Sequence, residues 1–159
     1  MSKLAYAALA VVILLAIGGF AAYKVVNKAV DDYDEEHTRH AEWDYTLEGQ
    51  SGFTTKTYTY KIAVKSLEKS DTKEVRVLCS SLQLVTKDGY HYSVTSSSGT
   101  KVVSVVTDDG YSGMGQGVAV GMKETKTFTV TFQVPNGVTV DKLELSQHGT
   151  SFTRNDLLL

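Results

Sequence analysis

The sequence predicts a mainly β protein in which one N-terminal transmembrane α-helix precedes an antiparallel β-sandwich. Residues 4–23 contain no charged side chain, whereas the later sequence is rich in short segments where apolar and polar residues alternate. Gly, Asp and Ser separate these segments, as is typical of turns between strands. A chain of 159 residues has room for this anchor and one further domain of about 110 to 120 residues.

Three regions are predicted along the chain. Residues 1–30 form a transmembrane helix with a short cytoplasmic N-terminus, residues 31–41 form an acidic juxtamembrane stalk, and residues 42–159 form the sandwich. As a helix rising about 1.5 Å per residue, residues 4–23 cover the roughly 30 Å hydrocarbon thickness of a bilayer. A cleaved signal peptide is the alternative, because Gly19-Phe-Ala21 fits a small-x-small cleavage site. The length of the apolar segment favours a retained anchor.

The orientation and packing of this helix follow from its flanks and its small residues. Lys3 and Lys24 flank both ends, so the positive-inside rule does not decide between the two orientations. The short segment before the span favours a cytoplasmic N-terminus, which makes the protein single-pass in the cell membrane with an extracytoplasmic β-domain. Gly18, Gly19 and Ala22 are the predicted anchor and helix-packing residues, because small side chains let helix backbones approach closely.

The stalk carries a dense run of acidic residues. Residues 31–36 contain five carboxylates, and His37, His40 and Glu42 follow as further candidate ligands. Zinc needs three or four ligands in fixed geometry, and calcium favours loops of the Asp-x-Asp-x-Asp-Gly type. Neither motif is complete, so we expect a solvated polar stalk and no metal site.

Two segments show the clearest strand pattern. In residues 127–134, Phe128, Val130, Phe132 and Val134 alternate with polar residues, and residues 55–65 show the same period. The alternation slips near Asp141, which predicts a β-bulge there. Further strands are predicted over residues 42–47, 75–84, 90–95, 102–106, 138–145 and 152–158.

Glycines mark the predicted turns and one predicted loop. Lys87-Asp-Gly89 and Asp108-Asp-Gly110 are typical of tight turns, since Gly accepts a positive φ. Residues 109–117 are so rich in Gly that we expect a flexible loop. Tyr111 and Met114 are its large side chains, and we interpret them as a candidate contact surface.

Composition argues against several classes of function. The formal net charge of −2 gives no basic excess for a phosphate backbone, so no nucleic-acid partner is expected. Cys79, the only cysteine, excludes an intramolecular disulfide, and its apolar neighbours predict a buried thiol. No Gly-x-Ser-x-Gly motif is present. We therefore predict no catalytic residues, no enzyme activity and no cofactor.

Two sequence stretches resemble a known domain family. Leu82-Gln-Leu-Val-Thr-Lys-Asp-Gly-Tyr-His-Tyr92 is followed by Gly121-Met-Lys-Glu-Thr-Lys-Thr-Phe-Thr-Val-Thr-Phe-Gln-Val-Pro135. Together they resemble the telokin-like, immunoglobulin-fold domains of prokaryotic surface proteins and lipoproteins, a family of unknown function. The resemblance implies an immunoglobulin-like sandwich without catalytic residues. The order of helix and β-domain is also similar to that of archaeal pilin-type subunits.

These observations predict a membrane-anchored binding or scaffolding module, such as an accessory subunit of a cell-envelope complex. The alternative is a structural subunit of a pilus-like surface filament with the apolar helix in its core. The expected partners are membrane lipid and either other envelope proteins or copies of the same chain.

Overall fold

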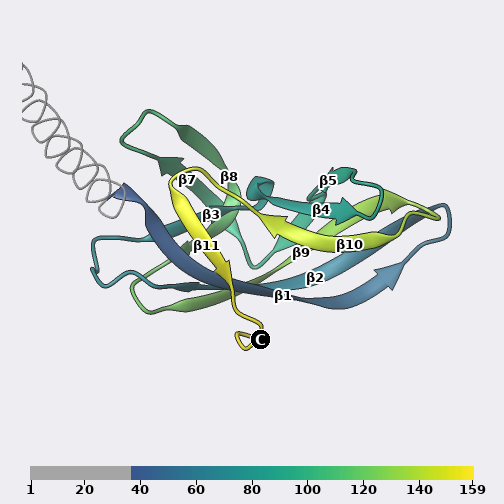
Figure 1. Cartoon of the computed structure of the whole chain (residues 1–159), viewed down its shortest axis with the longest axis horizontal. Coiled ribbons are helices and arrows are strands. Elements are labelled where there is room, and N and C mark those ends of the chain that lie inside the picture. The colour runs from purple at the N-terminus through teal and green to yellow at the C-terminus, as the bar shows by residue number, and fades with distance from the viewer. Residues whose placement is uncertain (1–36) are drawn as a thin grey trace, which may run out of the picture. The chain divides into compact units, whose positions relative to one another are not determined.

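The computed structural model describes residues 37–159, and within them Thr38–Leu159 form one compact unit. This unit is mainly β, as the alternating pattern predicts (Figure 1). Its elements are β1 (Arg39–Ser51), β2 (Thr55–Ser66), β3 (Val75–Leu78), the 3-10 turn η1 (Cys79–Ser81), β4 (Leu82–Thr86), β5 (His91–Ser93), β6 (Ser96–Ser98), β7 (Lys101–Val106), β8 (Ser112–Val120), β9 (Thr125–Pro135), β10 (Val140–Leu145) and β11 (Thr150–Arg154). The predicted anchor, with Gly18, Gly19 and Ala22, lies outside the described residues, as does the stalk up to residue 36.

The strands form three sheets. A five-stranded sheet has the order β11-β1-β2-β9-β6, and two three-stranded sheets have the orders β10-β4-β5 and β3-β8-β7. Strand β11 runs parallel to β1, whereas the other strand pairs of the described region are antiparallel. Residues 39–41 belong to β1, so the predicted stalk is too long at its C-terminal end.

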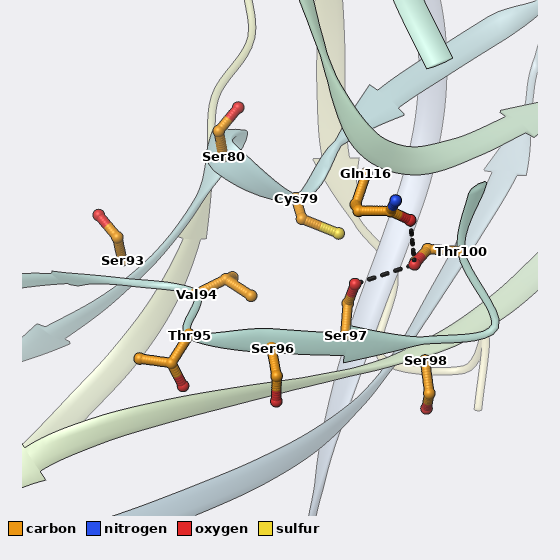
Figure 2. A pocket seen from close by; sticks show the side chains of 10 residues that line it. All are labelled: Cys79, Ser80, Ser93, Val94, Thr95, Ser96, Ser97, Ser98, Thr100 and Gln116. Atoms are coloured by element: carbon orange, nitrogen blue, oxygen red, sulfur yellow. Dashed lines mark hydrogen bonds between the residues drawn. The ribbon is translucent and has the colours of Figure 1, made fainter. Parts of the chain in front are cut away.

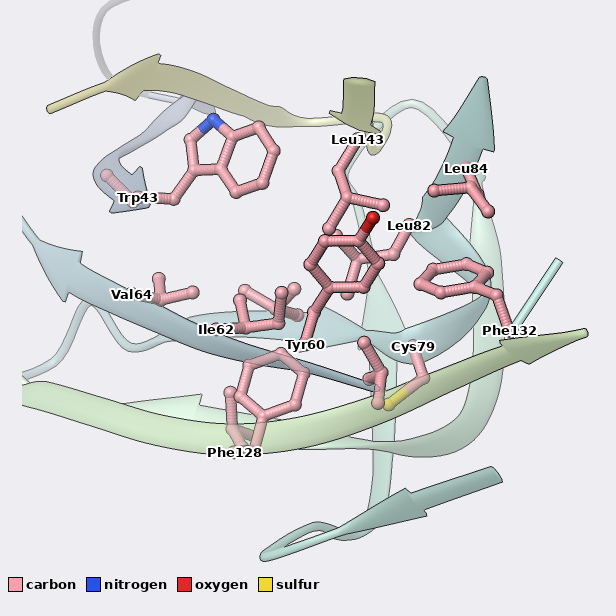
Figure 3. Close-up of a cluster of buried hydrophobic side chains, with 14 of the residues drawn as sticks. Trp43, Tyr60, Ile62, Val64, Cys79, Leu82, Leu84, Phe128, Phe132 and Leu143 are labelled. Atoms are coloured by element: carbon pink, nitrogen blue, oxygen red, sulfur yellow. The ribbon is translucent and has the colours of Figure 1, made fainter. Parts of the chain in front are cut away.

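One apolar core holds the three sheets together (Figure 3). The five-stranded sheet contributes the alternating residues of β2 and β9, which are buried as predicted, including Ile62, Phe128 and Phe132. Leu82, Leu84, Val118 and Leu143 face them from the three-stranded sheets. Burial, together with the nearby Tyr45 and Tyr58, raises the pKa of Tyr60 to about 12. The core therefore lies between two layers of sheet.

The predicted strand over residues 75–84 is wrong as a single element. It is interrupted by η1, so that β3 belongs to one three-stranded sheet and β4 to the other. The side chain of Gln147 holds this break: its Oε1 accepts the backbone N–H of Leu78 at 2.9 Å and the Ser81 hydroxyl at 3.0 Å. Cys79, in η1, is buried as expected.

The predicted turns and bulge are confirmed. Gly89 and Gly110 have φ values of 88° and 93°, and each donates its N–H to the residue three positions earlier, Thr86 or Thr107. The register of β10 against β4 shifts between Val140 and Lys142, next to Asp141. Positive φ and the two-residue period are local properties, which explains why the sequence reveals them.

The prediction of a flexible loop over residues 109–117 is wrong, because residues 112–117 belong to strand β8 (Ser112–Val120). This strand lies between β3 and β7 and pairs with both. Glycine is needed there for packing: a Cβ at Gly117 would lie 2.0 Å from the Val77 carbonyl oxygen and 2.8 Å from Val103 Cγ2. Gly117 therefore permits the close approach of β3 and β7 to β8 at this position. Strand β6 is a further element that the alternation did not predict.

Substitution of single glycines in β8 tests this packing role. We expect Gly117→Ala to lower the free energy of unfolding by about 1 to 3 kcal/mol or more, because the added Cβ overlaps backbone. Gly115→Ala is the matched control, since no atom lies within 4 Å of its added Cβ, and it should be neutral or stabilising by about 0.5 to 1 kcal/mol. Urea unfolding of both variants makes the comparison. Equal effects would show that β8 is not closely packed at Gly117.

Candidate functional site

A pocket opens where η1, the end of β5, β6 and β8 meet (Figure 2). Its volume is about 570 Å³, within the usual range of ligand pockets, about 300 to 1,000 Å³. No charged side chain is found among its lining residues, which are Cys79, Ser80, Ser93, Val94, Thr95, Ser96, Ser97, Ser98, Thr100 and Gln116. An uncharged, hydroxyl-rich lining favours neutral, hydrogen-bonding occupants over ions.

A chain of hydrogen bonds crosses this pocket from β6 to β8. The Ser97 and Thr100 hydroxyls lie 2.9 Å apart, and the Thr100 hydroxyl donates to Gln116 Oε1 at 3.1 Å. Burial raises the pKa of the Cys79 thiol, with the hydrogen bond to Ser97 acting in the opposite direction. The thiol is therefore not activated as a nucleophile.

A second candidate site is an exposed apolar surface on the hairpin formed by β7 and β8. Val102, Val106 and Met114 are 62%, 77% and 77% exposed, and we call these three residues the hairpin patch. Met114 lies opposite Ser104, diagonally between the two valines, so all three share one face of the hairpin. Gln116 lies opposite Val102 on the same face. The patch therefore continues into the pocket that Gln116 lines.

The two predicted contact residues lie on opposite faces of this hairpin. Met114 belongs to the hairpin patch, whereas the Tyr111 hydroxyl lies over Gly113, on the glycine face. The ring of Tyr111 is 5.1 Å from the ring of His148. On this face Leu78, Val103, Val105 and Ala119 form a second, smaller apolar cluster. Tyr111 lies beside this cluster, near Leu78. A contact role for Met114 stays a prediction.

A hydrogen bond between Asp109 and His148 joins the β7–β8 turn to the loop before β11. Asp109 bonds to His148 Nε2 through Oδ2 and accepts the Thr107 hydroxyl through Oδ1. The Thr107 hydrogen bond, with that of His148, lowers the pKa of Asp109. Both partners of the pair are about half exposed. The pair fastens a turn and offers no buried nucleophile.

Metal ligands do not converge in the described part of the chain. Within residues 37–159 no three His, Cys, Asp or Glu side chains come close enough to hold a metal ion. Of the stalk candidates, His40 donates its backbone N–H to Glu68 at 2.7 Å, and Glu42 accepts the Asn155 amide.

A search of residues 37–159 for a membrane-spanning helix, one with enough apolar length to cross a bilayer, finds none.

The chain matches no protein-family model and no curated protein. The sequence contained a signal for the hairpin patch, since residues 102–106 read Val-Val-Ser-Val-Val, with apolar residues on both faces. The pocket had no such signal, because its lining comes from separate segments.

The hydrogen bonds of Thr107 and His148 to the Asp109 carboxylate predict an acid-sensitive contribution to stability. Because the folded-state pKa of Asp109 is lowered, its contribution is present above the unfolded value of about 3.9 and is lost as pH falls through the folded value. We expect Asp109→Asn to be less stable than the native chain at pH 6, with a difference that closes below about pH 4. Thermal unfolding measured across pH 6 to 2.5 gives this difference. A difference that stays constant down to the lowest pH would contradict the assignment.

Proposed function

We propose that this chain is a membrane-anchored extracytoplasmic module that binds other proteins through the hairpin patch and acts as a scaffold in a cell-envelope complex. The exposure of Val102, Val106 and Met114 on one face carries the proposal. Contiguous exposed apolar side chains are costly to a soluble domain and commonly mark interaction surfaces. Methionine adapts its shape to different partners, which suits it to such a surface.

Two other exposed apolar residues provide a comparison. Phe53, at 92% exposure, lies in the turn between β1 and β2, and Tyr90, at 65%, lies in the turn before β5. Each stands alone at a loop tip, where single apolar residues need no explanation. The hairpin patch differs because its three residues are neighbours on paired strands.

We further propose that the β-domain is an immunoglobulin-like sandwich of the telokin type. Support comes from the core between two layers of sheet. Further support comes from the turn over residues 86–90, which places Asp88-Gly89 directly after strand β4, as in the sequence pattern of that family. The anchor is supported by the uncharged residues 4–23. In such a module the sheets position the hairpin and the helix fixes it to one membrane.

Membrane topology is tested with one introduced thiol. Ser98 is exposed on β6, so Ser98→Cys in a Cys79→Ala background gives a single accessible site. We expect a membrane-impermeant maleimide to label this variant in intact cells, with no labelling of Cys79→Ala alone. Labelling only after lysis would place the domain in the cytoplasm and overturn the proposal.

Partner binding is tested by a photoreactive amino acid at Met114. We expect irradiation of intact cells to give discrete covalent adducts, because the side chain lies in the proposed interface. The same substitution at Phe53 is the matched control, since that residue is even more exposed but lies outside the patch. Equal adduct yields from the two positions would argue against a binding role for the hairpin patch.

A further inference from the structure

Strand β7 presents an open edge of the β3-β8-β7 sheet. The N–H of Thr107 donates to the Tyr111 carbonyl at the hairpin turn, which fixes the hydrogen-bond alternation along the antiparallel pair. Residues 103 and 105 therefore bond to β8. Val102, Ser104 and Val106 direct their backbone N–H and C=O groups to the outer edge, where no other described strand pairs with them.

The opposite edge of the same sheet is closed. Gln147 accepts from the backbone N–H of Leu78 at 2.9 Å and donates its amide to the Arg76 carbonyl at 2.6 Å, so one side chain takes the place of a neighbouring strand on β3. Proteins usually protect exposed sheet edges in such ways. On β7 the Arg76 side chain takes the Ser104 carbonyl, and no described strand pairs with this edge. The backbone groups of Val102 and Val106 therefore stay available to a partner strand.

The sequence of β7 is symmetric about its exposed centre. Residues 102–106 read Val-Val-Ser-Val-Val in both directions. When two copies pair antiparallel about Ser104, Val102 of each copy lies opposite Val106 of the other, and the two Ser104 residues face each other. A two-fold interface places residue i of one copy against residue j of the other, and j against i. The palindrome therefore gives two identical Val–Val pairs about the axis. The partner that the edge fits is therefore a second copy of this chain.

Charge at the ends of β7 supports the same pairing. Lys101 begins the strand, and Asp108 and Asp109 follow its last residue. In the antiparallel register about Ser104, Lys101 lies opposite Thr107 of the second copy, next to its acidic turn. Each end of the interface thus brings one Lys near two carboxylates, and a parallel arrangement would instead bring like charges together.

We propose that β7 pairs antiparallel with β7 of a second copy, forming one continuous sheet in the order β3-β8-β7-β7-β8-β3. The inference rests on the proposed function, because it names the partner of the hairpin patch. Val102 of each copy forms a cross-strand pair with Val106 of the other. Met114 flanks these valines on the same face of the hairpin. A strand edge buries less than the roughly 800 Å² per partner of a typical stable interface. Confinement of both copies to one membrane raises their effective concentration and favours the pairing.

Arg76 competes with this pairing. Its Nη1 donates to the Ser104 carbonyl at 2.9 Å, at the centre of the open edge, while its Nε bonds to Glu74. A charged side chain at a sheet edge discourages strand addition. Removal of the guanidinium should therefore strengthen the dimer without touching the hairpin patch.

Disulfide crosslinking of the full chain in its membrane tests the register. In a Cys79→Ala background, Ser104→Cys places two thiols at directly opposite positions, where Cα atoms lie about 5.5 Å apart and can form a disulfide. Val106→Cys is the matched control: residue 106 is 77% exposed, but its two copies lie about 13 Å apart along the paired strands. With a mild oxidant we expect at least about fivefold more covalent dimer from Ser104→Cys. Equal or greater crosslinking of Val106→Cys would reflect random collision and would overturn the register.

Two further measurements separate this inference from the proposed function. Arg76→Ala, added to Ser104→Cys, should increase the dimer fraction, and an unchanged or smaller fraction would contradict edge pairing. Photo-adducts from Met114 should have twice the mass of the chain. Discrete adducts of another mass, with no Ser104→Cys dimer, would overturn the self-pairing while leaving the binding function in place. If neither Met114 photo-adducts nor a Ser104→Cys dimer forms, the binding function is overturned as well.

Discussion

The close approach of β3 and β8 at Gly117 is the constraint on which the rest of the candidate surface depends. The backbone of Val77 lies where a Cβ at Gly117 would be, and Val103 packs over the same position from β7. This contact brings three strands into one sheet and buries Leu78, Val103, Val105 and Ala119 in a cluster of their own. With one face closed in this way, the opposite face of the hairpin is left to carry Met114 and its neighbours. The exposed patch is thus a consequence of how the glycine face is packed.

The sequence predicted the elements whose structure is set by local pattern. Strands β2 and β9 were recognisable because their apolar residues recur every second position and all face one core. Strand β8 was not, because glycine has no side chain to show on which face it lies, and its role depends on Val77 and Val103. The break at Cys79 was equally hidden, since it is stabilised by Gln147, far away in the sequence. For the same reason the pocket, which joins several segments, could not be predicted.

The two hairpin turns show how one local motif serves two purposes. Thr86-Lys-Asp-Gly-Tyr90 and Thr107-Asp-Asp-Gly-Tyr111 share a spacing. In each turn the Thr hydroxyl bonds to the Asp carboxylate two residues later, and the Thr N–H donates to the Tyr carbonyl. The backbone therefore folds in the same way twice. The tyrosines differ in their surroundings: Tyr90 projects into solvent, whereas the ring of Tyr111 packs at a tilt against that of His148. The second turn is fastened to the loop before β11 through the Asp109 side chain, whereas the first is fastened through the backbone, where the N–H of Lys87 donates to the Thr139 carbonyl.

The pocket and the hairpin patch are best understood as one surface. Gln116 stands opposite Val102 on the patch face, and its Oε1 accepts the hydroxyl of Thr100 at the pocket rim. Thr100 in turn bonds to Ser97 of β6, which belongs to the five-stranded sheet. This hydrogen-bonded path therefore links the hairpin of β7 and β8 to the five-stranded sheet across the pocket.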